Sequence, residues 1–234
     1  MKQAAMPPIQ AIVLDLDGTL YSRAHVRSRM LLELAREFVR HPGRQYHVGR
    51  FLYAYRKAQE ELRRLESSDA GDQLSLACRR TGADPAWARA VVDEWMDQRP
   101  LRFLARAIRP DLSTFLAAAR RRGIRLGLCS DYPADRKLHA LGIRDAFDAV
   151  VSAHDPSVKR FKPDPAGLLT VMAALDARPN SVVYVGDRPD VDAEAARRAG
   201  VRAFILSSTV PPSAEWVGVK NFAELGVQLG VMTP

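Results

Sequence analysis

Two aspartates separated by one residue, Asp15 and Asp17, follow directly after the apolar run 11–14 and precede Gly18 and Thr19. Four consecutive apolar residues are typical of a strand that is buried on both faces. On extended backbone, side chains two positions apart point the same way, so the two carboxylates repel each other unless a cation neutralises them. One carboxylate can then attack as a nucleophile while the other transfers protons beside a divalent metal. A strand followed by an ordinary Asp-Gly turn is the alternative interpretation.

Two more predicted strands, 124–129 and 182–185, also end in polar residues. Ligands of an open parallel sheet bind beyond the carboxyl ends of its strands, so these residues are expected to converge on one site. The polar residues are Ser130 and Asp131 after the first of these strands, and Asp187, Asp190 and Asp192 after the second.

Lys162 adds a cation to this set, because it precedes the helix that leads into strand 182–185. A phosphoryl group needs such partners: a metal, a cation and donors for its oxygens, and a nucleophile in line with the bond that breaks. Taken singly, Ser130 is equally suited to a helix N-cap and Lys162 to the protein surface. The prediction of phosphoryl chemistry therefore depends on the convergence of these residues.

The elements that must position this set alternate between strand and helix after residue 110, which predicts a parallel sheet with helices on both faces. Residues 26–100 show only helical periodicity, so they are expected to form an all-helical insertion between the first strand and the rest. The expected strands lie at 11–14, 124–129, 147–152, 182–185 and 201–206, and the expected helices of the insertion at 26–40, 48–65, 73–80 and 85–98.

The composition of the 234-residue chain is that of a globular protein, with 47% hydrophobic and 26% charged residues. Its net charge of +8 suits anionic substrates and also nucleic acid, but the basic residues are scattered and not interleaved with aromatics, which favours an arginine-rich solvated surface. No apolar run approaches the roughly 20 residues of a membrane span, and residues 1–10 lack a secretory signal. With Cys78 and Cys129 far apart, no disulfide is implied and a reducing cytoplasm is expected.

These residues together resemble the four motifs of the haloacid dehalogenase (HAD) superfamily of aspartate-nucleophile hydrolases, in order and from about residue 11 to about residue 206. The first motif is Asp15-Leu16-Asp17-Gly18-Thr19, the second Leu128-Cys129-Ser130, the third Phe161-Lys162-Pro163-Asp164-Pro165, and the fourth runs from Val185 to Asp192, followed by Ala199-Gly200. The resemblance implies a Rossmann-like α/β core of residues 1–22 and 101–234 and a helical cap of residues 23–100, which closes over the site.

The resemblance also implies a role for each of four residues. Asp15 is the nucleophile that forms an aspartyl-phosphate, and Asp17 is the general acid and then the general base. Ser130 donates to the phosphoryl oxygens, and Lys162 offsets the negative charge of Asp15 and the phosphate. Asp131 stands where many relatives have Asn or Gly, so it adds a negative charge near the phosphate.

A magnesium ion is the cofactor that the resemblance implies, held by Asp15, the carbonyl oxygen of Asp17, and Asp187. Hard oxygen ligands suit Mg²⁺. Asp192 is expected as a further acid near the metal, because its spacing from Asp187 fits the family better than that of Asp190, which is suited to cap the following helix.

The expected function is a Mg²⁺-dependent phosphatase that hydrolyses a small phosphorylated metabolite. Phosphate chemistry is favoured over dehalogenation because dehalogenases of this superfamily lack the second acid, here Asp17. A phosphomutase or phosphotransferase that uses the same aspartyl-phosphate is the first alternative, and a non-catalytic protein bound to nucleic acid is the second. Neither a membrane nor nucleic acid is the favoured partner, and no pattern in the sequence specifies an oligomer.

Overall fold

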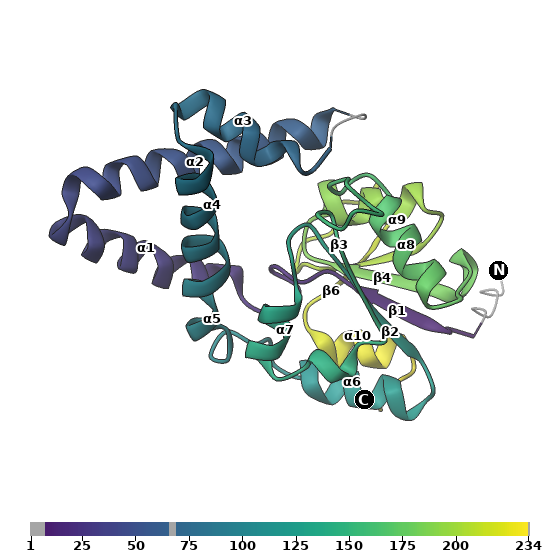
Figure 1. Ribbon diagram of the computed structural model, residues 1–234. Coiled ribbons are helices and arrows are strands. Elements are labelled where there is room, and N and C mark those ends of the chain that lie inside the picture. Colours follow the sequence, from purple (N-terminus) through teal and green to yellow (C-terminus); the bar gives the residue numbers. More distant parts are fainter. Residues whose placement is uncertain (1–7, 66–68, 234) are drawn as a thin grey trace.

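A six-stranded, entirely parallel sheet forms the centre of the protein, with a separate group of helices to one side of it (Figure 1). This is a computed structural model, and it describes residues 8–65 and 69–233. The strand order is β3-β2-β1-β4-β5-β6, and the predicted α/β fold class is confirmed. The strands are β1 (Ala11–Leu14), β2 (Arg125–Ser130), β3 (Ala149–Ser152), β4 (Val182–Gly186), β5 (Arg202–Leu206) and β6 (Val217–Val219).

The register of the central strands brings their carboxyl ends level with one another. Leu14, the last residue of β1, is paired with Leu128 of β2 on one side and with Val185 of β4 on the other. The backbone N–H of Asp15 still donates to the carbonyl oxygen of Val185, at 2.8 Å. The residues that follow β1, β2 and β4 therefore meet at one edge of the sheet, as expected for parallel strands.

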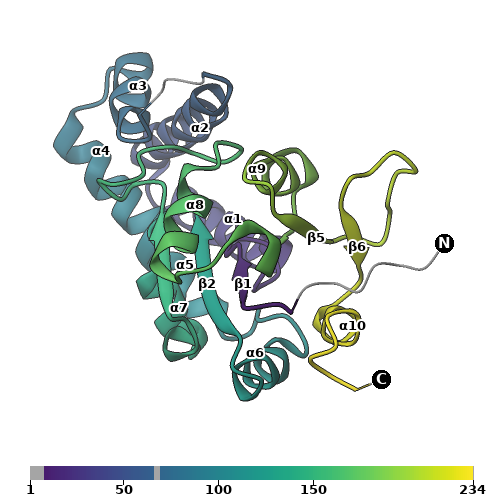
Figure 2. The same ribbon diagram turned by 90° about the vertical axis from the view of Figure 1, so that its right-hand side faces the viewer.

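Helices cover both faces of the sheet, because the connections between successive strands from β1 to β5 cross over through helices. Helices α6 and α10 lie against one face and α8 and α9 against the other (Figures 1 and 2). In the core part of the chain the helices are α6 (Leu112–Arg121), α7 (Asp135–Leu141), α8 (Ala166–Ala174), α9 (Glu194–Arg198) and α10 (Phe222–Gln228), with 3₁₀ turns η2 (Arg144–Ala146) and η3 (Pro179–Ser181) and the π-helical turn η4 (Pro189–Ala193).

The helical group between β1 and β2 has a hydrophobic core of its own, in which Phe51, Trp95 and Val48 are buried. The first helix of this group buries only Val26, and two of its apolar side chains face outward, since Leu31 is 56% and Phe38 48% exposed. The elements of this group are α1 (Arg23–Arg40), α2 (Pro42–Arg64), α3 (Asp72–Thr81), α4 (Pro85–Val92), the π-helical η1 (Asp93–Gln98) and α5 (Arg99–Leu104).

The structure differs from the expected elements in three main respects. Helix α2 begins at Pro42, six residues before the predicted start, because proline is well suited to the first turn of a helix. Only His41 separates α2 from the end of α1. The predicted helix 85–98 is split into α4 and η1. Strand β6 was not predicted, because three residues around Gly218 carry no strand periodicity, and it forms only by pairing with β5. In the part of the chain that the structure describes, no helix is long and apolar enough to cross a bilayer.

Candidate active site

The residues predicted from three strand ends and from Lys162 gather around one cavity of about 470 Å³, between the edge of the sheet and the helical group. Its walls include Asp15, Asp17, Asp131, Lys162 and Asp192. Ser130 ends β2 at the same edge, buried, with its hydroxyl oxygen accepting the backbone N–H of Tyr132 at 3.2 Å. The predicted convergence is therefore present in the fold.

Asp15 is held from two sides although only 5% of its surface is exposed. Its Oδ1 accepts from Lys162 Nζ at 2.5 Å, and its Oδ2 accepts from the hydroxyl of Thr19 at 2.9 Å. Burial raises the pKa of Asp15 to about 7, against the lowering effect of Lys162 and with further raising by the carboxylates of Asp192 and Asp187. These contacts fix the carboxylate that the first motif marks as the nucleophile.

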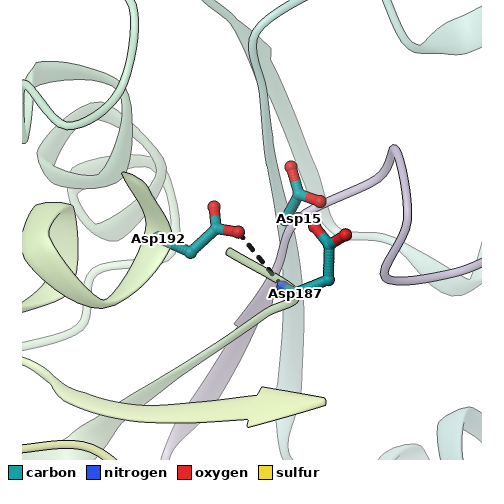
Figure 3. A group of neighbouring side chains, drawn as sticks. All are labelled: Asp15, Asp187 and Asp192. Atoms are coloured by element: carbon teal, nitrogen blue, oxygen red, sulfur yellow. Dashed lines mark hydrogen bonds between the residues drawn. The ribbon is translucent and has the colours of Figure 1, made fainter. Parts of the chain in front are cut away.

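Asp192 connects Lys162 to the loop after β4. Its Oδ1 accepts from Lys162 Nζ at 2.7 Å and from Tyr184 Oη at 3.1 Å. Its Oδ2 accepts the backbone N–H of Asp187 at 3.1 Å (Figure 3) and the backbone N–H of Arg188 at 3.0 Å. The attraction of Lys162 and the two backbone donors outweigh burial, so the pKa of Asp192 lies below its usual range. Asp192 thus orients the loop that carries Asp187.

Asp190 takes no part in this arrangement. It is exposed and forms an ion pair with Arg188 at 2.6 Å. Of the two alternatives considered from the sequence, the structure brings Asp192 to the other carboxylates.

Asp15, Asp187 and Asp192 offer oxygen atoms that all lie within 4.8 Å of one another, which is close enough to hold a metal ion (Figure 3). A cationic group already faces two of the implied ligands: Arg23 donates to the carbonyl oxygen of Asp17 and lies 3.5 Å from Asp187 Oδ1. Asp187 Oδ1 is buried and accepts no hydrogen bond within the described residues. An all-oxygen donor set that attracts a cation, and in which Asp187 Oδ1 accepts no hydrogen bond from the described residues, fits a hard divalent metal.

Gly18 allows this approach of Asp187. A Cβ at position 18 would lie 2.2 Å from Asp187 Oδ2, and the φ of Gly18 is +105°. Only glycine adopts such a backbone conformation without strain, so the Asp-Gly pair of the first motif serves the site and not only a turn.

Asp17 has two partners that the sequence analysis missed. Lys137 Nζ, from α7, donates to both of its carboxylate oxygens at 2.7 and 3.0 Å, and the Tyr21 hydroxyl donates to Oδ1. Burial opposes the ionisation of Asp17, but the attraction of Lys137 outweighs it, so the pKa of Asp17 is lowered. A signal for Lys137 existed: with helical spacing it shares the apolar side of α7 with Leu138 and Leu141.

The extra negative charge of Asp131 is compensated from the helical group. Its Oδ2 pairs with Arg63 of α2, and its Oδ1 accepts the backbone N–H of Lys162 at 3.1 Å. Arg63 also pairs with Glu60 at 2.7 Å. Sequence periodicity could not reveal this pair, because the two residues lie 68 positions apart.

Comparison with known proteins identifies the same family that the sequence motifs resemble. Residues 9–200 match the haloacid dehalogenase-like hydrolase family. A glyceraldehyde 3-phosphate phosphatase of Methanopyrus kandleri is 30% identical over 82% of this chain and 82% of its own, and a phosphoglycolate phosphatase of Nitrosospira multiformis is 32% identical over 85% and 83%.

Among solved structures, a HAD phosphatase from Thermococcus onnurineus has the same fold, with a TM-score of 0.67 at 21% identity, over 95% of this chain and 98% of that one. The family match, the sequence relatives and the acidic site together support one conclusion. The chain belongs to the haloacid dehalogenase-like hydrolases, as one of their phosphoric monoester hydrolases.

Proposed function

We propose that this enzyme is a Mg²⁺-dependent phosphatase that hydrolyses a small phosphomonoester through an aspartyl-phosphate on Asp15. One observation carries the proposal: the buried Asp15 carboxylate lines a cavity, is neutralised by Lys162 at 2.5 Å, and lies within 4.8 Å of two further acids. The names of the relatives, phosphatases of glyceraldehyde 3-phosphate and of phosphoglycolate, support a small phosphorylated metabolite as substrate.

The protein groups divide the reaction between them. A carboxylate oxygen of Asp15 attacks phosphorus, the bond from phosphorus to the leaving oxygen breaks, and Asp17 gives that oxygen a proton. Water then attacks the phosphorus of the aspartyl-phosphate, Asp17 takes a proton from the water, and the Asp15 carboxylate is released. Lys162 and Ser130 hold the phosphoryl oxygens in both halves.

Asp15, the Asp17 carbonyl and Asp187 would hold Mg²⁺, with Asp192 orienting the Asp187 loop. The bound ion would neutralise the charge between the carboxylate and the phosphate dianion. We further propose that residues 1–22 and 101–234 are the catalytic core and residues 23–100 the cap. The two cysteines are free thiols, which supports a reducing cytoplasm as the location.

The proposal is tested by phosphate release from 4-nitrophenyl phosphate with Mg²⁺, by the purified enzyme and by Asp15→Asn. The variant is expected to lose at least about a thousand-fold in kcat, because it removes the nucleophile. The exposed Arg29→Gln serves as a matched control and retains full activity. Full activity of Asp15→Asn would refute the proposal, and activity that requires an added sugar bisphosphate would favour a phosphotransferase instead.

A further inference from the structure

Two basic side chains of the helical group line the active-site cavity without a partner. Arg27 of α1 and Arg56 of α2 have no hydrogen bond or ion pair within the residues that the structure describes. Every carboxylate on the cavity wall is already paired with a cation, so none is free to neutralise these two guanidinium groups. The pairs are Asp15 and Asp192 with Lys162, Asp17 with Lys137, Asp131 with Arg63, and Glu60 with Arg63 and Arg188. This wall therefore carries positive charge that an anionic ligand would neutralise.

Two hydrogen-bond donors on α2 also lack an acceptor. Gln59 is 7% exposed, the Arg63 side chain is 9% exposed, and both belong to the cavity wall. They lie four residues apart and so share one side of the helix. Gln59 Nε2 and Arg63 Nε are buried and unpaired among the described residues. Buried donors without acceptors are rare in folded proteins, and the adjoining cavity is where an acceptor can enter.

The orientation of the Gln59 amide follows from its neighbours. Gln73 Nε2 donates to the carbonyl oxygen of Tyr55 at 2.9 Å and to the Tyr132 hydroxyl at 3.0 Å. A carbonyl oxygen only accepts, so the group of Gln73 that faces Tyr55 must be its NH₂ group. The Tyr132 hydroxyl accepts from this NH₂ group and therefore donates its own hydrogen to Gln59 Oε1, at 2.9 Å. The second polar atom of the Gln59 side chain is consequently Nε2, whose NH₂ group is a hydrogen-bond donor.

Apart from Arg23 and Glu60, the rest of the wall that the helical group contributes is mainly apolar. A volume of about 470 Å³ is in the range of cavities that enclose whole organic ligands. Its apolar side chains come from α1, α2 and η1, and include Val26, Met30, Leu34, Leu52, Trp95 and Met96. The part of the ligand next to these side chains must itself be apolar, or the cavity would bury polar groups without partners.

We propose that the leaving group of the substrate carries a second anionic oxygen group on an apolar body. Arg27 and Arg56 neutralise that group, and the donors of Gln59 and Arg63 lie on the same wall to bind its oxygens. Tyr132 and Gln73 are positioning residues that orient Gln59. This inference rests on the proposed phosphatase function and adds the class of substrate.

The test compares two phosphate esters of the same shape, 4-carboxyphenyl phosphate and the neutral 4-carbamoylphenyl phosphate. The wild-type enzyme is expected to prefer the carboxylate by about tenfold or more in kcat/KM, since charge-assisted hydrogen bonds are the strong ones. Arg56→Gln and Gln59→Leu are each expected to reduce this preference to within about threefold. Gln59→Glu places an anion where the amide donor was, so it is expected to reverse the preference. Arg29→Gln, on α1 outside the cavity lining, keeps the full preference.

A third ester, 4-phosphonophenyl phosphate, distinguishes the two sources of the anionic group. A stronger preference for the phosphonate ester would indicate that the anionic group of the natural leaving group is a second phosphate. A stronger preference for the carboxylate ester would indicate that it is a carboxylic acid. For Tyr132→Phe, a positioning role predicts a higher KM for the carboxylate ester at unchanged kcat, because the orientation of Gln59 is lost.

The inference is overturned if the wild-type enzyme treats the charged and neutral esters alike, or if Arg56→Gln and Gln59→Leu both leave the preference intact. Arg56 is exposed, so its variant does not endanger folding. Binding of both esters to Asp15→Asn, measured by calorimetry, separates this outcome from failure of the proposed function. Tighter binding of the carboxylate without any turnover by wild type would refute the phosphatase proposal alone.

Discussion

At the scale of single residues, each carboxylate of the site contacts a cationic side chain. Lys162 bridges Asp15 and Asp192, and Lys137 holds Asp17. Burying a carboxylate is costly unless it is paired, and the two lysines make this burial tolerable. Lys137 is the less expected of the two, because it lies outside the sequence motifs and contacts Asp17, the acid that we propose exchanges protons.

Replacing Lys137 by Met is expected to lower kcat/KM for a phosphate ester by about 100-fold, because the Asp17 carboxylate loses the group that orients it for proton transfer. Arg136→Met is the matched control, since Arg136 is the adjacent exposed cation on α7 and pairs with Asp93 at 3.1 Å. Its activity is expected to stay within about twofold of wild type. Equal losses in the two variants would show that Lys137 has no special relation to the site.

The thiol of Cys129, at the end of β2, is predicted to resist alkylation in the native protein. Burial raises its pKa to about 12, so at pH 8 only about one molecule in ten thousand carries the thiolate, and the fraction grows only as pH rises toward that pKa. Cys78 is partly exposed and is the internal control. Mass spectrometry after iodoacetamide treatment should find label on Cys78 first, and on Cys129 only after denaturation. Native labelling of both at one rate would contradict this burial.

At the scale of elements, the site depends on how closely helices approach the sheet. Gly127 in β2 faces α8, and a Cβ there would lie 2.4 Å from Val171 Cγ1 and 2.9 Å from Leu175 Cδ1. At the end of β4, a Cβ on Gly186 would lie 2.4 Å from the Cβ of Asp192. The sheet edge therefore keeps its geometry because glycines leave room for the neighbouring side chains.

Gly127→Ala is expected to lower the free energy of unfolding by about 1–3 kcal/mol, the usual effect of overpacking a core. Gly49→Ala, within α2, meets nothing within 4 Å and should raise it by about 0.5–1 kcal/mol, because alanine loses less backbone entropy in a helix. Urea titration of both variants measures the two effects. A Gly127→Ala variant as stable as Gly49→Ala would mean that α8 can move away from β2 at no cost.

At the scale of the whole molecule, the helical group is held over the sheet edge by polar contacts. Arg63 pairs with Asp131, Glu60 pairs with Arg188, and Tyr132 hydrogen-bonds to α2 and α3. The Arg63–Asp131 pair is the most enclosed, with both side chains about nine-tenths buried. Both residues line the cavity, so this pair joins the helical group to the sheet edge at the cavity wall.

A double-mutant cycle on Arg63→Met and Asp131→Asn is expected to give a coupling energy of about 1–3 kcal/mol for unfolding, as for buried charges in contact. The cycle on the exposed α1 pair Arg40 and Glu37, 3.5 Å apart, is the control and should give at most about 0.5 kcal/mol. Similar values from the two cycles would show that the Arg63–Asp131 pair does not hold the helical group in place.

Much of the fold and of the candidate site was predictable because its signals are local. An apolar run that stops at Asp15, Ser130 or Asp187 marks both a buried strand and the polar end of that strand. Parallel pairing then places those ends together. The alternation of strands and helices, and the helical stretch inserted after β1, follow from the same short-range periodicity.

The partners of those residues depend on packing between distant segments, which no periodicity records. Lys137 meets Asp17 across 120 positions, Arg63 meets Asp131 across 68, and the Tyr132 hydroxyl meets Gln59 across 73. Strand β6 likewise exists only through its pairing with β5. Local patterns were therefore enough to predict the acids of the candidate site. Which cations and donors surround them followed from how α7 and the helical group pack around the sheet edge, because long-range contacts are set by the complete fold.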